Sequence, residues 1–206
     1  MLNFVRRLLG IHKPEAHVHA RELGGLVASV VAWRRGGLEQ ALRDGVAVVD
    51  LEQDRNSLAW YAEGAGIQDP LVAELLAIPV GELDTELFLL ASYRIEAAGG
   101  IAWALGLIET LPPPEQRIGL HDVVTLFPLQ GEPSPAIDHA KRRPDAELEA
   151  KLADLIPVLD RPVDPGDEAA NIAFSRAFER VRALQWVQSG APFLDDVDPL
   201  REPASR

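Results

Sequence analysis

Along most of the chain, hydrophobic residues recur at intervals of three and four, the spacing that places side chains on one face of an α-helix. The first long pattern follows Pro14, and the Gly36–Gly37 pair predicts the end of that helix. A clear start signal lies at Asp69, a candidate N-cap, with Pro70 at the first helical position. Further helices are expected over residues 38–45, 55–66, 68–79, 144–160 and 168–190. The sequence therefore predicts an all-α fold, a mostly helical single domain.

Two segments do not follow this helical pattern clearly. Residues 46–52 (VAVVDLE) are rich in β-branched side chains and are the best strand candidate. Residues 120–129 fit either a strand or a short helix. We therefore expect at most a small strand pair beside the helices.

The most apolar long segment is YRIEAAGGIAWALGLIETLPPP, residues 93–114. It completes a helix predicted over 84–110, which the following prolines would end, because proline removes a donor and clashes with the preceding turn. Apolar side chains surround this helix on all sides, a pattern typical of a central, buried helix. Gly99 and Gly106 belong to a face of small residues that would let a neighbouring backbone approach closely.

Two charged residues, Arg94 and Glu96, lie inside this predicted central helix. Unpaired buried charges are too costly to keep, so each needs a partner from another helix or from a ligand. The helix at 168–190 supplies candidate partners, because its Glu179 and Trp186 stand seven residues apart. The central helix has the same spacing between its glutamate and Trp103.

We therefore expect these two helices to pack together, with Arg94 paired to Glu179, or Glu96 paired to Arg180 or Arg182. A guanidinium–carboxylate fork is directional and would fix the register of the helices. The resulting cluster would be either a binding site or a purely structural network. The candidate residues are Arg94, Glu96, Trp103, Glu179, Arg180 and Trp186.

The segments YRIEAAGGIAWALGLIETLP and ERVRALQWVQSG…LDDV resemble two signatures of the bacterial family catalogued as domain of unknown function 4272. The first has an Arg-x-Glu pair, then Trp-Ala-Leu-Gly and Leu-Pro. The second has Glu-Arg, then Ala-Leu-Asn-Trp and a Trp-Asp-x-Val element. This chain departs from the signatures at three places: Tyr93 stands where a tryptophan is usual, Gln185 replaces the asparagine, and Phe193-Leu194 precede Asp195-Asp196 where Trp-Asp is usual. The resemblance covers about residues 55–197 and implies a mostly helical domain. It implies no activity.

Charge is unevenly distributed along the chain. The net charge is −12, yet residues 1–43 carry seven Lys and Arg against three Glu. The remainder therefore holds an excess of sixteen negative charges. An acidic body disfavours nucleic acid and anionic membranes as partners and would favour a basic protein. The expected organisation is a basic N-terminal helical region over 1–45, a helical core over 46–197 and a frayed tail over 198–206.

Motifs for catalysis, metals and cofactors are missing from the sequence. His12, His17 and His19 with Glu22 supply only one pair at the helical spacing that metal ligands need, which is too few for a site. We find no phosphate-binding loop, dinucleotide fingerprint or serine elbow, so we expect no cofactor and assign no catalytic residue. The chain has no cysteine, which fits a reducing, cytoplasmic location, and no transmembrane segment is expected.

These observations leave two classes of function. The first is a non-catalytic protein–protein interaction module, one form of which is an acidic antagonist or immunity-type protein that covers a basic partner. The alternative is a helical enzyme or small-ligand-binding domain with a cleft at the Arg94/Glu96/Glu179/Arg180 cluster. The oligomeric state is left open.

Overall fold

The computed structural model describes residues 19–127, 134–162 and 164–200 of the 206-residue chain. Within these ranges every regular element is a helix and none is a strand, so the predicted all-α class is confirmed. The α-helices are α2 (Ala20–Arg43), α3 (Val48–Gly64), α4 (Pro70–Ala77), α5 (Thr85–Ala104), α6 (Leu120–Val124), α7 (Asp145–Leu159) and α8 (Glu168–Ser189), with short 3₁₀ helices η2 (Pro135–His139) and η3 (Leu194–Asp196).

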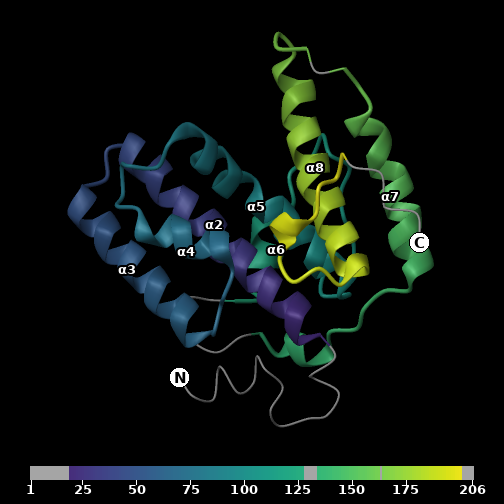
Figure 1. Cartoon of the computed structure of the whole chain (residues 1–206), viewed down its shortest axis with the longest axis horizontal. Coiled ribbons are helices and arrows are strands. Elements are labelled where there is room, and N and C mark those ends of the chain that lie inside the picture. The colour runs from purple at the N-terminus through teal and green to yellow at the C-terminus, as the bar shows by residue number, and fades with distance from the viewer. Residues whose placement is uncertain (1–18, 128–133, 163, 201–206) are drawn as a thin grey trace.

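Helix α5 lies at the centre of the molecule, between two groups of helices (Figure 1). Its most extensive contacts are with α2 on one side and α8 on the other. Helices α3 and α4 pack against α2, whereas α7 packs against α8. The upper half of α8 projects beyond α5, and α7 lies beside it on one side of the body (Figure 1).

Aspartate caps fix the start of three helices. Asp69 accepts a hydrogen bond from the backbone N–H of Val72 at the start of α4, and Asp84 does the same for Leu87 at the start of α5. Asp167 caps α8 in the same way. Each carboxylate accepts a hydrogen bond from a backbone N–H that has no partner within the helix. Because this interaction is local, the sequence could predict where these helices start.

The central helix ends earlier than predicted, at Ala104 rather than near residue 110. Gly106 adopts a left-handed φ of 64°, and the N–H groups of Gly106 and Leu107 return to the carbonyls of Trp103 and Ala102. This Schellman arrangement closes the last turn before the prolines are reached. The early end is a correction, and it removes Gly106 from the small helical face where the sequence placed it.

Only the second half of α5 is surrounded by protein on all sides. Residues 94–104 are all buried, whereas Leu89 in the first half is 48% exposed. The expectation of a helix that is buried all round along its whole length is therefore wrong for its first half. The exposed first half leaves room for a groove beside α8.

Two further sequence predictions, the strand at 46–52 and the helix end at Gly36–Gly37, are wrong for identifiable reasons. The strand candidate at 46–52 contains the first residues of α3, which buries Leu51 and Leu58 on one face instead of pairing with another strand. The other ambiguous segment, 120–129, begins as the short helix α6, and its last two residues lie outside the described part. Helix α2 continues through Gly36–Gly37 instead of ending there. The glycine at position 36 serves close packing, because an added Cβ would lie 3.1 Å from the Cβ of Ala91 in α5.

Close contact between α5 and α8 depends on Gly100. A Cβ atom at this position would lie 2.9 Å from the Cβ of Ala183. We therefore expect Gly100→Ala to lower the free energy of unfolding by about 1–3 kcal/mol, because the helices would have to separate.

Gly24 provides the matched control, because a Cβ at that helical position of α2 meets nothing within 4 Å. Gly24→Ala should raise the free energy of unfolding by up to about 1 kcal/mol through helix propensity. Urea unfolding of both variants provides the measurement. Equal effects of the two substitutions would show that the α5–α8 contact is not tight.

Candidate functional site

Arg94 lies on the face of α5 that meets α8, and its side chain is 2% exposed. Its Nη1 donates to Glu179 Oε2 of α8 at 3.3 Å, and its Nη2 donates to Asp195 Oδ1 of η3. Arg182 completes the group, because its Nη1 lies 3.1 Å from Glu179 Oε1 and 3.0 Å from Asp195 Oδ1. Two guanidiniums and two carboxylates therefore join α5, α8 and η3.

Glu96 forms a second buried group between α5 and α8. Its Oε2 accepts hydrogen bonds from Nε and Nη2 of Arg180 at 3.0 and 2.6 Å. Arg176 Nε lies 3.6 Å from the other oxygen, and the Ile118 N–H donates to that oxygen at 3.4 Å. Arg180 also donates to the carbonyls of Pro112 and Gln116, which ties the segment after α5 to α8.

The two predicted pairings are thus both present, Arg94 with Glu179 and Glu96 with Arg180. Arg182, the other candidate partner of Glu96, contacts Glu179 instead. We call this set the buried charge cluster: its buried members are Arg94, Glu96, Glu179 and Arg180, and the partly buried Arg176 and Arg182 and the exposed Asp195 lie at its edge.

The two tryptophans of the predicted site stack against other arginines. Trp103 lies beneath the guanidinium of Arg143 with 4.7 Å to the ring centroid, and Trp186 beneath that of Arg21 at 4.5 Å. Both arginines also donate to helix C-terminal carbonyls, Arg143 to Trp103 O and Arg21 to Trp186 O. Arg143 and Arg21 therefore cap the C-terminal ends of α5 and α8, and each tryptophan ring is paired with an arginine outside the buried charge cluster.

Burial raises the pKa of Glu179 above its ordinary value, and the positive charges of Arg94 and Arg182 oppose this shift. Burial also raises the pKa of Asp69, the N-cap of α4, with a smaller contribution from the negative charge of Asp195. The physical reason for both raised pKa values is removal from water, which disfavours the charged form of a carboxylate.

The raised pKa of Glu179 predicts a specific pH dependence. The folded chain binds this proton more tightly than the unfolded chain, so the contribution of Glu179 to stability falls as pH rises above the ordinary value of 4.5. Glu179→Gln lacks this titration. We expect the free energy of unfolding of the wild type, measured relative to Glu179→Gln by urea titration, to decrease from pH 4.5 to neutral pH. An increase over that range would mean that folding favours the ionised carboxylate.

Beside Arg94 the buried charge cluster leaves almost no open space. The cavity beside Arg94, lined also by Asp69 and Leu194, measures about 10 Å³, which is at the lower limit for one water molecule. Among the described side chains, the Nε atoms of Arg94 and Arg182 and the indole nitrogen of Trp186 are buried without a hydrogen-bond partner. Every charged group of the cluster nevertheless has an oppositely charged neighbour within 4 Å.

Sequence reasoning missed Asp195 and a further buried ion pair. Asp195 belongs to the LDDV element of the second signature segment, so a signal for it was present. The other pair is Arg35–Glu39 in α2, at 2.8 Å, where Glu39 also accepts from the backbone N–H of Gly81. It was missed because the helix break predicted at Gly36–Gly37 divides two residues that share one helical face.

A groove of about 490 Å³ lies between the first half of α5 and the first half of α8. Its floor is apolar, and among the described residues the charged ones that line it are acidic, Glu168 and Glu179. We call this cavity the α5–α8 groove; its apolar lining residues are Leu89, Leu90, Tyr93, Ile172, Phe174 and Phe178.

The segment beside this groove carries a strong negative charge. Residues 144–168, which we call the acidic limb, contain eight acidic residues against Lys151 and Arg161. All eight acidic residues are exposed. Because Pro165 and Glu168 line the α5–α8 groove, the acidic limb and the groove are continuous.

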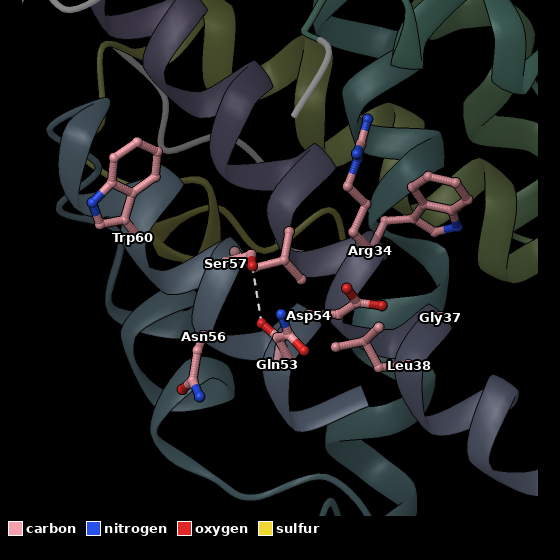
Figure 2. Close-up of a pocket in the computed structure, with 10 residues that line it drawn as sticks. Arg34, Gly37, Leu38, Gln53, Asp54, Asn56, Ser57 and Trp60 are labelled. Atoms are coloured by element: carbon pink, nitrogen blue, oxygen red, sulfur yellow. Dashed lines mark hydrogen bonds between the residues drawn. The ribbon is translucent and has the colours of Figure 1, made fainter. Parts of the chain in front are cut away.

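A second and larger groove, of about 690 Å³, lies between α2 and α3 and is drawn in Figure 2. We call it the α2–α3 groove. Unlike the α5–α8 groove, it includes a basic side chain, Arg34 of α2.

Comparison with known proteins shows the family of this chain. The profile of a family described as domain of unknown function (DUF4272) matches residues 81–196. The chain belongs to this family. The family named from the two sequence signatures is therefore confirmed. No curated protein and no solved structure matches the chain.

The DUF4272 match contains the buried charge cluster, the α5–α8 groove and the acidic limb. The α2–α3 groove lies before it in the chain. Thus the buried charge cluster and the acidic groove are features of the family region, whereas the second groove belongs to the segment that precedes it.

The described residues contain no candidate metal site and no candidate membrane span. No group of three His, Asp or Glu side chains there could hold a metal ion, and His12 and His17 lie outside those residues. In the same part of the chain, no helix has the length and apolar character required to cross a membrane.

Proposed function

We propose that this protein is a non-catalytic interaction module of the cytoplasm that binds a basic polypeptide. In this proposal the acidic limb attracts the partner, and the α5–α8 groove takes up its apolar side chains. By covering a basic surface the protein would act as an antagonist of its partner. The observation that carries the proposal is the continuity of an apolar groove, whose charged lining is acidic, with a limb that has eight exposed acidic residues.

In the proposed complex, charge and apolar area contribute to binding in different ways. Exposed charges accelerate encounter and reject partners of the same sign, but they contribute little affinity by themselves. A concave apolar patch supplies the desolvated contacts in which most binding energy resides. The α5–α8 groove offers aromatic walls from Phe174 and Phe178 and lies where partner segments can reach it from the limb.

The buried charge cluster supports this choice over the alternative of a ligand site at Arg94 and Glu96. Those side chains are 2% exposed, and their charged atoms are already bound to Glu179, Asp195 and Arg180. A ligand would have to displace these partners, because the cavity beside Arg94 is too small to hold one.

Affinity capture with matched surface variants tests the proposal. Leu89→Asp places a charge in the α5–α8 groove at a residue that is 48% exposed, and Val49→Asp places the same charge in α3 at a residue that is 70% exposed. We expect the wild type and Val49→Asp to retain the same basic protein from the native host, and Leu89→Asp to lose it. Retention should fall as salt rises, because exposed charges are screened.

Two outcomes would contradict the proposal. One is a partner whose retention does not change with salt. The other is a partner retained equally by Leu89→Asp and the wild type, since the groove would then have no part in binding.

A further inference from the structure

The α2–α3 groove contains an arginine whose environment differs from that of the other sheltered arginines. In the described ranges, nine arginines that are not fully exposed each have a carboxylate oxygen within 4 Å: Arg21, Arg35, Arg55, Arg94, Arg142, Arg143, Arg176, Arg180 and Arg182. Arg34 has no such carboxylate among the described residues, although it too is partly sheltered from solvent. The described arginines that share this lack, Arg43, Arg117 and Arg161, are exposed.

The hydrogen bonds of Arg34 are also incomplete. Its Nη2 donates to the carbonyl of Phe127 at 3.3 Å, whereas its Nε is buried without a partner in the described part of the chain. Burial lowers the pKa of Arg34, and nearby Tyr61 opposes this shift. A cation taken out of water without a counter-charge is costly, so an anion that reached it would be bound favourably.

The Arg34 side chain borders open space. A Cβ atom added at Gly37, one helical turn away, would meet no atom within 4 Å. Asp54 of α3 also lines the groove, but it makes no ion pair with Arg34, and Figure 2 shows the Arg34 side chain extending away from it. The guanidinium therefore keeps donors that a bound acceptor could use.

Aromatic and uncharged polar side chains supply the rest of the lining. Trp33 and Trp60 contribute two indoles, and Trp60 is 56% exposed. Gln53, Asn56 and Ser57 of α3 also line the groove, with the Ser57 hydroxyl donating to the backbone carbonyl of Gln53 (Figure 2). Large flat apolar surfaces with a few polar groups are typical of pockets for small organic ligands, and a volume of about 690 Å³ falls in their usual range.

The charge of the surroundings limits the ligand to a single negative charge. Asp54 in the lining disfavours phosphates and other multiply charged anions. A carboxylate carries one charge and accepts two parallel N–H groups from a guanidinium. We propose that the α2–α3 groove binds a small aromatic carboxylate, with its carboxylate on Arg34 and its ring against Trp33 or Trp60.

The proposal can be tested with 2-naphthoate as the probe and 2-naphthamide as its uncharged analogue. We expect 2-naphthoate to shift the indole N–H resonances of Trp33 and Trp60 in the ¹⁵N-labelled full chain, assigned by Trp→Phe variants. The amide should bind at least about tenfold more weakly, because it lacks the charge-assisted hydrogen bonds. Arg34→Gln should weaken naphthoate binding by a similar factor.

Arg43→Gln is the matched control, because Arg43 lies on the same helix, is exposed and has no carboxylate partner. This variant should bind naphthoate like the wild type. Urea unfolding of the unliganded variants checks folding, and Arg34→Gln should be as stable as the wild type because it removes an uncompensated cation.

Three results would overturn the proposal: no resonance shift with naphthoate, equal binding of naphthoate and naphthamide, or equal binding by Arg34→Gln and the wild type. Folding failure of Arg34→Gln would contradict it as well, since Arg34 would then be a structural residue. These outcomes do not involve the α5–α8 groove, so they leave the proposed partner-binding function unaffected.

Discussion

Arg180→Ala is expected to lower the free energy of unfolding by about 3–5 kcal/mol, because it leaves a buried carboxylate without its main partner. Arg180 is fully buried, and its Nε and Nη2 bind Glu96 Oε2 at 3.0 and 2.6 Å. After the substitution, Glu96 would keep only the Ile118 N–H at 3.4 Å and Arg176 at 3.6 Å. The carbonyls of Pro112 and Gln116 would also lose their donor.

Guanidinium unfolding followed by tryptophan fluorescence measures this loss, because Trp103 and Trp186 are buried and report on α5 and α8. Arg117→Ala is the control, since Arg117 is an exposed arginine in the segment that Arg180 ties down. It should change the free energy of unfolding by no more than about 0.5 kcal/mol. A loss of that small size in Arg180→Ala would place the Glu96 pair among the weak surface interactions.

Arg94→Ala is expected to cost about 3 kcal/mol, near the lower end of the range for breaking a buried ion pair. Its partner Glu179 keeps Arg182 at 3.1 Å, so the remaining carboxylate is not wholly uncompensated. The substitution also removes a side chain that is 2% exposed and leaves a cavity between α5 and η3.

Arg94→Lys separates charge from geometry in the same place. Lysine keeps the positive charge but cannot bridge Glu179 and Asp195 with two planar donors, so it should recover only part of the loss. Unfolding titrations of both variants give the comparison. Full recovery by lysine would show that the charge alone is needed, and no loss in Arg94→Ala would show that Arg94 does not join α5 to α8.

The contact between the two signature helices could be predicted because its signals are local and strong. Charges in an apolar helix require partners, and one other helix carried both signs at matching positions. Helix starts at Asp69 and Asp84 were equally readable, because the capping carboxylate acts on donors three residues away.

The failures arose where contacts from distant parts of the chain decide the outcome. The Gly36–Gly37 pair was predicted to end a helix, but α2 continues through it. Gly36 instead allows close contact with Ala91 of α5. The valines at 46–49 favour a strand by propensity, yet no partner strand lies in the described residues and α3 buries Leu58 instead. Propensity is a weak signal that tertiary packing overrides.

Both grooves escaped sequence analysis for the same reason. The α5–α8 groove exists because the first halves of two helices diverge above the close contact at Gly100, and divergence leaves no periodic signal. The α2–α3 groove brings Arg34 into a space bordered by Trp60, residues that no motif connects. Here the sequence indicates which helices are in contact, but not where they separate to form a groove.

The central claim is that a basic partner binds at the α5–α8 groove, beside the buried charges that hold α5 and α8 together. The most direct measurement is photo-crosslinking in the native host, with p-benzoylphenylalanine in place of Phe178 in the α5–α8 groove or of Trp60 in the α2–α3 groove. The account predicts that the Phe178 position forms a crosslink to a basic protein and that the Trp60 position does not crosslink to that protein. A crosslink to that protein from Trp60 alone, or none from Phe178 in a folded variant, would contradict it.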